Sequence, residues 1–557
     1  MMLQETRIKR IIHKNLNLLN KVNSIEKPGC TAGLFIFIYI YIRHLTPKHF
    51  MADKAQFLDT IATGYTTKGD KITLGTAMLD GEPVEGAYVN IPLKTLNRHG
   101  LIAGATGTGK TKTLQIIAEH LSDNGIPVLM MDIKGDLSGI AKRGEEKSFI
   151  TERHTKIGLP YEAKGLPVEL MSLSKQNGVR LRSTVSEFGP VLFSRVLGLN
   201  DTQTGVMGVV FKYCDDHNMP LLDFKDIKKV LQYLTDEGKD EIEKEYGKIS
   251  ASSTGAMLRK IIELEQQDAN LFFGELSFEI DDLMRINNEG QGYVNIIRLT
   301  DIQDKPKLFS TFMLSLLAEI YNQMPEKGDA DRPELVIFID EAHLIFDEAS
   351  KTLLDQIETI VKLIRSKGVG LFFVTQNPTD VPNGVLSQLG LKVQHALRAF
   401  TATDRKAIKL TAENYPLSEF YKTDEVITQL GTGEALITAL NEKGIPTPLA
   451  ATMLRAPMSR MDILTKEEID EINNISKLVK KYAEEIDRES ACEILTKKIE
   501  AITAQQQQEE QRKAEEKNTA GKRTSTTGST LEKQILKTVT SATFIRGVFG
   551  VLNKMFK

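Results

Sequence analysis

The sequence predicts an α/β fold in which helices cover both faces of a mainly parallel β-sheet. Three short apolar segments, at residues 128–131, 335–339 and 370–375, resemble buried parallel strands, and a polar side chain follows each of them. A glycine-rich phosphate-binding sequence lies between a fourth apolar segment, residues 101–103, and a helical pattern at 110–121. Together with the strand at 128–131 these elements form a strand–helix–strand unit, from which a parallel sheet is built.

Composition sets the broad class of the protein. The 557 residues should divide into two to four folding units, and 41% hydrophobic and 26% charged residues are typical of a soluble globular protein. A net charge of −3 argues against coating nucleic acid through bulk positive charge, although a few local cations could still bind it. The three cysteines lie far apart without metal-ligand spacing, which argues against a disulfide framework or a zinc site and favours a cytoplasmic location.

Residues 1–50 differ in character from the rest of the chain. They contain eight Lys and Arg against two Glu, and their apolar run at 32–42 is shorter than the ~20 residues that a membrane-spanning helix needs. Arg43 and His44 follow this run where a signal peptide would have small residues. Because a new pattern starts at Met51, we interpret 1–50 as an extension from a mis-assigned start and expect no stable membrane association. A membrane anchor is the alternative.

The rest of the chain is expected to form three regions. Short apolar segments separated by Gly75, Gly81 and Gly86 predict a small β-rich cap at residues 51–97. The α/β core should span 98–457, with a mostly helical insertion at about 145–333 that returns to the sheet through a strand-like segment at 293–299, and a late strand at 433–440. Residues 458–557 should form a helical, partly disordered tail. This tail ends in a helix that is apolar on one face and either docks on the protein or lies on a membrane surface.

The strongest motif fits the pattern G-x-x-x-x-G-K-[ST]. Amide groups of such a loop and of the following helix N-terminus point at phosphate groups. Lys110 should reach the β- and γ-phosphates, and the hydroxyl of Thr111 should bind Mg²⁺. The sequence therefore predicts ATP and Mg²⁺ as cofactors, with the nucleotide held by Gly104, Ala105, Thr106, Gly107, Thr108, Gly109, Lys110, Thr111 and Lys112.

A second motif, Asp340-Glu341, follows the apolar strand at 335–339. Asp340 is placed to hold the Mg²⁺ shell beside Thr111. An ATPase must orient and deprotonate a water molecule, and Glu341, one residue further on, has the chemistry of that general base. His343 is expected to be a packing or coupling residue. The pair of carboxylates favours hydrolysis of ATP over transfer of its phosphate to a small molecule.

Further candidate site residues are suggested by their positions in the sequence relative to the predicted strands. Gln376 follows the strand at 370–375 and is expected to sense the γ-phosphate and the attacking water. Arg365, Arg398 and Arg405 are candidates for an arginine that a neighbouring subunit supplies to the γ-phosphate. Asp132 is expected to line either the site or the surface along which a polymer moves.

These motifs and several other stretches resemble the HerA/FtsK superfamily, most closely its HerA-like branch typified by YjgR. The similarity extends over residues 56–457, and its clearest parts are residues 91–110, 180–190, 272–275, 340–346, 364–377 and 394–401. The resemblance implies a RecA-like P-loop NTPase core of the additional-strand, catalytic-glutamate type. It also implies a motor, usually hexameric, that hydrolyses ATP to translocate on double-stranded DNA. Two departures are the short cap and Leu391-Lys392, where this branch is expected to have Asn-Arg.

Three functional hypotheses remain at this point. The first is a DNA translocase or helicase that works as a homo-oligomeric ring. The second is an ATPase that moves or remodels protein, as VirB4-like motors do. The third is a nucleotide-dependent scaffold with little turnover, against which the intact Lys110, Asp340 and Glu341 argue.

Overall fold

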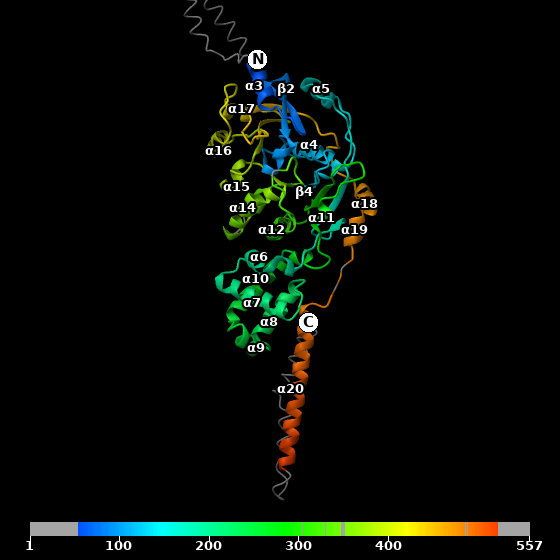
Figure 1. The fold of residues 1–557 in the computed structure, drawn as a ribbon, viewed down its shortest axis with the longest axis vertical. Coiled ribbons are helices and arrows are strands. Elements are labelled where there is room, and N and C mark those ends of the chain that lie inside the picture. Colours follow the sequence, from blue (N-terminus) through cyan, green and yellow to red (C-terminus); the bar gives the residue numbers. More distant parts are fainter. Residues whose placement is uncertain are drawn as a thin grey trace, which may run out of the picture. The chain divides into compact units, whose positions relative to one another are not determined.

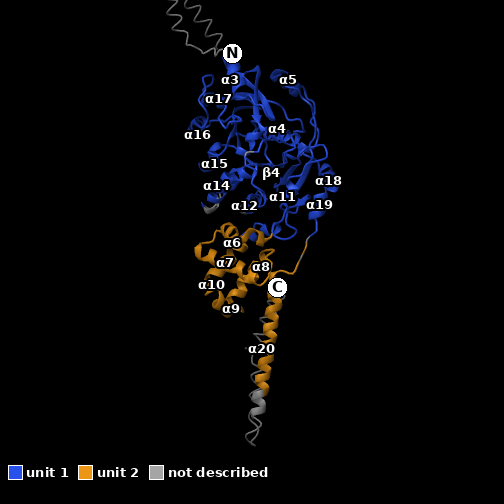
Figure 2. Cartoon of the chain, in the orientation of Figure 1, with its two compact units in different colours: residues 1–183, 264–485 blue, residues 184–263, 486–557 orange. Residues whose placement is uncertain are grey.

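One twelve-stranded sheet dominates the first of the two units into which the computed structural model divides the chain (Figure 2). The structure describes residues 54–303, 305–328, 330–346, 351–484, 486 and 488–521. The first unit comprises residues 1–183 and 264–485, and the second comprises 184–263 and 486–557. The predicted extension at 1–50 and the terminal helix that begins at Leu531 lie outside the described residues.

The strands follow the order β2-β1-β12-β11-β10-β3-β9-β8-β4-β7-β5-β6 across the sheet. All pairs from β10 to β6 are parallel, and the pairs from β2 to β10 are antiparallel. The strands are β1 (Lys71–Leu79), β2 (Glu82–Pro92), β3 (Gly100–Ala103), β4 (Val128–Asp132), β5 (Val168–Ser172), β6 (Val179–Arg180), β7 (Val294–Arg298), β8 (Leu335–Ile339), β9 (Val369–Thr375), β10 (Leu391–Gln394), β11 (Glu434–Thr438) and β12 (Ala450–Leu454). The mainly parallel α/β fold is confirmed, and β9 is the additional strand between β3 and β8.

Helices of the first unit cover both faces of the sheet (Figure 1). They are α3 (Lys54–Gly64), α4 (Lys110–Asp123), α5 (Ser148–Ile157), α11 (Ile280–Leu283), α12 (Pro306–Gln323), α13 (His343–Phe346), α14 (Lys351–Ile364), α15 (Asn383–Leu386), α16 (Ala402–Glu413), α17 (Thr423–Gln429), α18 (Lys466–Ile475) and α19 (Lys477–Tyr482). Every residue of β3, β4, β8 and β9 is buried, as expected for strands with helices on both sides. Leu114 and Leu121 of α4 share one core cluster with Val128 and Phe338 of the sheet.

The predicted β-rich cap is part of the main sheet. Strand β1 pairs with β2 and also with β12, where Gly75 lies opposite Leu454. An unpaired strand edge has free backbone donors and acceptors, and the last strand of the core satisfies them here. The antiparallel extension therefore joins the N-terminal strands β1 and β2 to β12, the last strand of the sheet in chain order.

The predicted insertion is narrower than residues 145–333. Strands β5, β6 and β7 fall within that interval and return the chain to the sheet, so the excursion into the second unit covers only 184–263. The strand-like segment predicted at 293–299 corresponds to β7, whereas β5 and β6, with five and two residues, are too short for a clear alternating pattern. The helices of the second unit are α6 (Val185–Val196), α7 (Asp201–Asp216), α8 (Phe224–Thr235), α9 (Lys239–Glu245), α10 (Ala251–Glu265) and α20 (Ala491–Gly521).

The predicted tail does not begin as a separate region at residue 458. Residues 456–464, here called the strap, connect β12 to α18, and α18 packs against β5 of the sheet. In the second unit, α20 begins against α8, where the carboxylate of Asp226 accepts a hydrogen bond of 2.8 Å from the amide of Cys492. No helix in the described part of the chain is long and apolar enough to cross a membrane.

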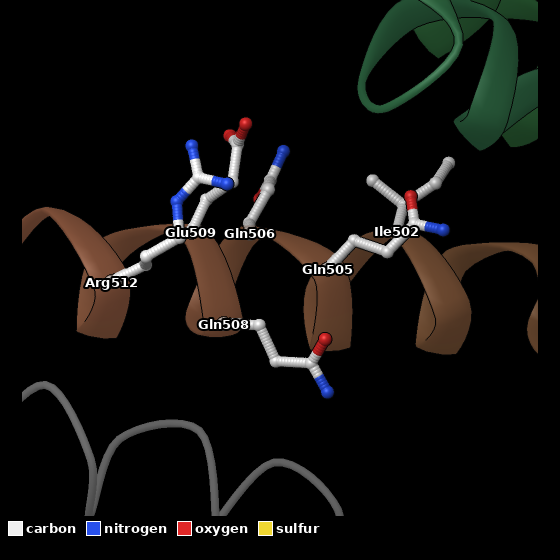
Figure 3. A pocket seen from close by; sticks show the side chains of 6 residues that line it. All are labelled: Ile502, Gln505, Gln506, Gln508, Glu509 and Arg512. Carbon is white, nitrogen blue, oxygen red and sulfur yellow. The ribbon is translucent and has the colours of Figure 1, made fainter.

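The outer part of α20 is solvent-exposed from Thr503 to Glu515. Figure 3 shows Gln506 and Gln508 on this stretch pointing to opposite sides of the helix. A hollow of about 550 Å³ is lined by side chains of α20 alone, which are Ile502, Gln505, Gln506, Gln508, Glu509 and Arg512. Side chains that diverge from one exposed helix do not converge on a ligand, so we assign no site to this hollow.

Candidate nucleotide-binding and catalytic site

The carboxyl ends of four neighbouring strands meet at one edge of the sheet. Parallel pairing places Ala103 of β3 opposite Thr375 of β9 and Gln394 of β10. In the same way Ile339 of β8 lies opposite Phe373 of β9. The phosphate loop, the two carboxylates after β8 and the residues after β9 and β10 therefore share this edge.

The backbone of the phosphate loop is held by the neighbouring strand ends. The amide of Gly104 donates to the carbonyl of Thr375 at 3.2 Å, and that of Ala105 donates to the carbonyl of Ala396 at 2.9 Å. Thr106 and Gly107 are exposed at the tip of the loop. The exposed tip leaves their amides accessible to an anion, as a phosphate-binding loop requires.

His395 lies directly beneath the loop and explains why Gly104 is a glycine. A Cβ atom at Gly104 would lie 2.5 Å from Cβ of His395, and the φ of 153° at Gly104 belongs to the region that favours glycine. His395 is fully buried and its Nε2 lies 2.8 Å from the hydroxyl of Thr113 in α4. Burial, with a smaller effect of the charge on Lys110, lowers the pKa of His395 to about 4. A neutral imidazole thus connects β10 to the helix that follows the loop.

Lys110 begins α4 and turns its side chain back over the loop. Its Nζ donates to the carbonyls of Gly104 at 2.7 Å and Ala105 at 3.3 Å, and only 7% of the residue is exposed. Burial and then the charge of Lys134 lower the pKa of Lys110, and the charge of Glu341 acts in the opposite direction. The ammonium group lies among the oxygens of the loop that the motif predicts to cradle phosphate.

Thr111 and Asp340 provide a hydroxyl and a carboxylate for a divalent cation. Thr111 is half-buried in the first turn of α4, and Asp340 follows β8 directly with 4% of its surface exposed. Among the described residues, Oδ2 of Asp340 has no hydrogen-bond partner. Burial, followed by the charge of Glu341, raises the pKa of Asp340 to about 7. A buried carboxylate oxygen without a partner fits Mg²⁺, which prefers such oxygens.

Glu341 is buried and its backbone is strained. Its φ of 47° lies in the left-handed region, which non-glycine residues seldom adopt. One carboxylate oxygen forms an ion pair with Nζ of Lys134, and the other lies 3.3 Å from Nδ1 of His343. Although partial burial opposes it, the contact with Glu341 raises the pKa of Lys134. His343 thus contacts the candidate general base.

Asp132 organises the loop after β4. Its carboxylate accepts hydrogen bonds from the amides of Gly135 at 2.7 Å, Asp136 at 3.1 Å and Leu137 at 3.3 Å. Burial, followed by the charge of Asp136, raises the pKa of Asp132 to about 6. Asp132 lies at the same sheet edge and shapes the loop that carries Lys134.

The sensor and arginine candidates lie at different ends of the sheet. Gln376 is exposed directly after β9, at the edge that carries the phosphate loop. Arg398 follows β10 at this edge, and its guanidinium donates to the carbonyls of Thr428 at 2.9 Å and Leu430 at 3.4 Å. Arg405 is exposed on α16.

Arg365 precedes β9 and is exposed at the opposite edge of the sheet. Its charge contributes to the lowered pKa of His99, which stands before β3 at the same edge. Within one chain the structure therefore brings Arg398 and Gln376 to the edge with the phosphate loop and leaves Arg365 at the other.

Lys112 is turned toward the strap and away from the loop's carbonyls. Its Nζ donates to the carbonyl of Met461 at 2.7 Å. Further along the same face of α4, the side chain of Gln115 donates to the hydroxyl of Ser459 at 2.6 Å, and the carboxylate of Glu119 accepts from the amide of Met458 at 2.9 Å. The motif alone could not show that Lys112 differs in role from the neighbouring phosphate-loop residues. Its partner Met461 belongs to the strap, which is more than 300 residues further along the chain.

Sequence reasoning assigned no role to Lys134 or to His395. Lys134 stood in a stretch considered only for Asp132, and His395 stood in a stretch considered only for family resemblance. Both residues directly follow a strand of the parallel core or lie two positions beyond it. A search for charged and titratable side chains after every predicted core strand would have found Lys134. It would have missed His395, because β10 had not been predicted.

Comparisons with known proteins agree with these motifs. The model of the family described as Helicase HerA-like C-terminal matches residues 78–553. A probable helicase of Methanocaldococcus jannaschii is 26% identical over 422 residues, which cover 69% of this chain and 72% of that protein. The DNA double-strand break repair helicase HerA of Sulfolobus acidocaldarius is 22% identical over 396 residues, which cover 68% of this chain and 70% of that protein.

Two solved structures are also similar in part. The bacterial conjugative coupling protein TrwBdeltaN70 has a TM-score of 0.47 at 15% identity, covering 73% of this chain and 94% of that chain. VirB4 of Thermoanaerobacter pseudethanolicus has a TM-score of 0.44 at 17% identity, covering 70% of this chain and 98% of that chain.

Proposed function

This chain belongs to the helicase HerA-like C-terminal family, and we propose that it is an ATP-hydrolysing motor that translocates on double-stranded DNA. The observation that carries the proposal is the meeting of Lys110, Asp340 and Glu341 at one sheet edge, with β9 between their strands. This arrangement supports hydrolysis of a nucleotide, because it combines a phosphate-binding cation, a metal-binding carboxylate and a general base.

Each residue has a separate task in the proposed reaction. The amides of the phosphate loop and Nζ of Lys110 hold the β- and γ-phosphates. Thr111 and Asp340 hold Mg²⁺, which neutralises charge on the phosphate oxygens when it is bound. Glu341 accepts the proton of the attacking water, and Gln376 orients that water.

DNA as the polymer is supported by the family and by its named relatives. The curated relatives include several proteins named DNA double-strand break repair helicase HerA and one named DNA import protein CedB. A chain with a net charge of −3 would hold DNA through a few local Lys and Arg contacts, so binding should weaken steeply with salt. We also propose a homo-oligomeric ring, in which Arg398 of one subunit completes the site of the next.

The test is the ATPase rate of the full chain with and without linear duplex DNA. We expect stimulation by DNA that falls as salt rises, because each phosphate contact releases counterions. The Glu341→Gln variant should bind ATP and DNA but not hydrolyse, which separates binding from chemistry. A wild-type rate that no nucleic acid changes at any salt concentration would contradict the DNA proposal and favour protein remodelling.

A further inference from the structure

A hollow of about 720 Å³ lies at the amino edge of the sheet, opposite the edge that carries the phosphate loop. Here called the amino-edge hollow, it lies between residues 166–169, 285–288 and 475–477. These segments are the start of β5, the stretch before β7 and the junction of α18 with α19. All of them belong to the first unit of the chain.

The amino-edge hollow continues along the sheet edge. A second hollow of about 420 Å³ shares Arg285 and Ile286 with it and reaches Pro127 before β4 and Glu334 before β8. The strands β5, β7, β4 and β8 are neighbours in the sheet. Four strands spaced about 4.8 Å apart span roughly 14 Å, which is about the length of four extended residues. The two hollows together therefore have the length of a short extended peptide.

A buried network fixes one wall of the amino-edge hollow. Glu169 is 4% exposed, and its carboxylate lies 2.9 Å from Nη2 of Arg285 and accepts a hydrogen bond of 2.7 Å from the hydroxyl of Ser476. Nε of Arg285 donates to the carbonyl of Asp282 at 3.0 Å, and the guanidinium lies 4.4 Å from the centre of the Tyr293 ring. A wall held by so many contacts is preformed, so a ligand loses little affinity in ordering it.

The charges that line the amino-edge hollow are mainly positive. The carboxylate of Glu169 is paired with Arg285, which leaves the charges of Lys142 and Lys477. Lys142 pairs at 3.3 Å with Glu471, whose side chain is 69% exposed, and such a surface pair contributes little free energy. Lys477 is exposed at the start of α19. The hollow therefore favours a ligand that carries carboxylates.

Apolar side chains line the same hollow. Ile475 is 81% exposed at the end of α18, and Ile286 is 50% exposed. Leu166 and Val168 line the space as well. Single exposed apolar side chains are common, but a group of them in one electropositive hollow indicates binding of an apolar side chain. This lining does not suit the phosphate backbone of a nucleic acid, which binds through polar groups.

We propose that the amino-edge hollow binds an acidic peptide segment of a partner protein. An aliphatic or aromatic side chain of the peptide packs against Ile286 and Ile475. Flanking Asp or Glu side chains pair with Lys142 and Lys477. The site lies at the other edge of the sheet from Lys110, so the proposal stands apart from the proposed function, and a bound peptide leaves the phosphate loop accessible.

Peptide selection on the full chain tests this proposal without assuming a partner. A library of random peptides displayed on phage is selected in parallel on the immobilised wild type and on the double variant Lys142→Glu, Lys477→Glu. We expect the wild type to enrich sequences in which Leu, Ile, Phe or Trp is flanked by Asp or Glu. If the wild type enriches no such sequences beyond those that the double variant also enriches, the proposal is overturned.

The most enriched peptide, labelled with fluorescein, then measures affinity by fluorescence anisotropy. Lys477→Glu and Ile475→Ser should each weaken binding about tenfold or more, because one reverses a charge and the other removes the apolar contact. Lys248→Glu and Ile262→Ser are matched controls, since both residues are exposed on the second unit, and they should leave the affinity unchanged. All four variants should keep the wild-type melting temperature, which shows that the fold is intact.

Three further results would contradict the inference. Equal affinity of the peptide for the wild type, Lys477→Glu and Ile475→Ser would mean that it binds elsewhere. Displacement of the peptide by linear duplex DNA at the same salt concentration would make the hollow a nucleic-acid contact. A smaller oligomer for Ile475→Ser than for the wild type, measured by light scattering without peptide, would make the hollow an interface between copies of this chain.

Discussion

The two ends of strand β9 differ in what they hold. At its carboxyl end lie the phosphate loop, Asp340 and Glu341, whose charges and strained backbone provide the means for chemistry. At its amino end His99 accepts a hydrogen bond from the amide of Leu371 at 3.0 Å and lies 2.8 Å from the carbonyl of Val361. The carboxyl end of β9 thus lies among the candidate catalytic residues, whereas its amino end is bound to His99 in a contact that stabilises the fold.

The largest effect should come from the reactive edge. Lys110→Ala should lower the rate of ATP hydrolysis at least about 1,000-fold, because no other described cation contacts the carbonyls of the loop. Melting temperature should change little, which a thermal denaturation curve would check. A variant that hydrolyses ATP at the wild-type rate would remove the phosphate-loop assignment.

The next comparison concerns the two arginines. Arg398→Ala should lower hydrolysis about 100-fold or more while ATP still binds, and Arg365→Ala should change the rate less than about threefold. Mixing Arg398→Ala with Glu341→Gln should restore partial activity, because some interfaces then combine an intact arginine with an intact glutamate.

The mixture also provides the control. Arg365→Ala mixed with Glu341→Gln should show only the activity of the Arg365→Ala subunits themselves. If both variants co-assemble and the Arg398→Ala mixture remains inactive, Arg398 acts within its own subunit or not at all. Equal losses for both arginine variants would contradict the distinction between the two edges.

The smallest effect on activity should come from His99, whose role is stability. Burial is the main cause that lowers the pKa of His99 to about 4, below the ordinary value of 6.5. The unfolded chain therefore binds the proton more readily between these values, and the free energy of unfolding falls as pH falls through this window. The contribution of His99 should decrease by about 2 kcal/mol between pH 7 and pH 5.

Denaturant unfolding at both pH values would measure this decrease. His99→Gln should lower the free energy of unfolding at pH 7 by about 1 to 3 kcal/mol, because a buried amide and carbonyl lose their partner. The variant should also show a weaker dependence on pH, while its affinity for ATP stays unchanged. An identical pH dependence in both proteins would show that His99 does not titrate as the burial implies.

Features encoded in a local stretch of sequence could be predicted, and contacts between distant parts of the chain could not. Strands β3, β4, β8 and β9 were foreseen because each is a mainly apolar run that leads into a site motif: the phosphate loop after β3, Asp132 at the end of β4, Asp340 after β8 and Gln376 after β9. Lys110, Asp340 and Glu341 were foreseen because motif and strand end coincide. Local patterns did not reveal β5, whose five residues stand in a helix-rich region, or the partners of Lys112 and Lys134. Those partners come from distant parts of the chain, and only the folded sheet brings them together.

The fastening of the strap to α4 has a mechanical consequence. The first turn of α4 carries Lys110 and Thr111, and the next turns of the same rigid helix carry Gln115 and Glu119, which hold the strap. A shift of α4 in response to a phosphate group would pull directly on the strap, and through it on α18, which packs against β5. Helix α4 can therefore transmit a movement at the nucleotide-binding loop to the strap.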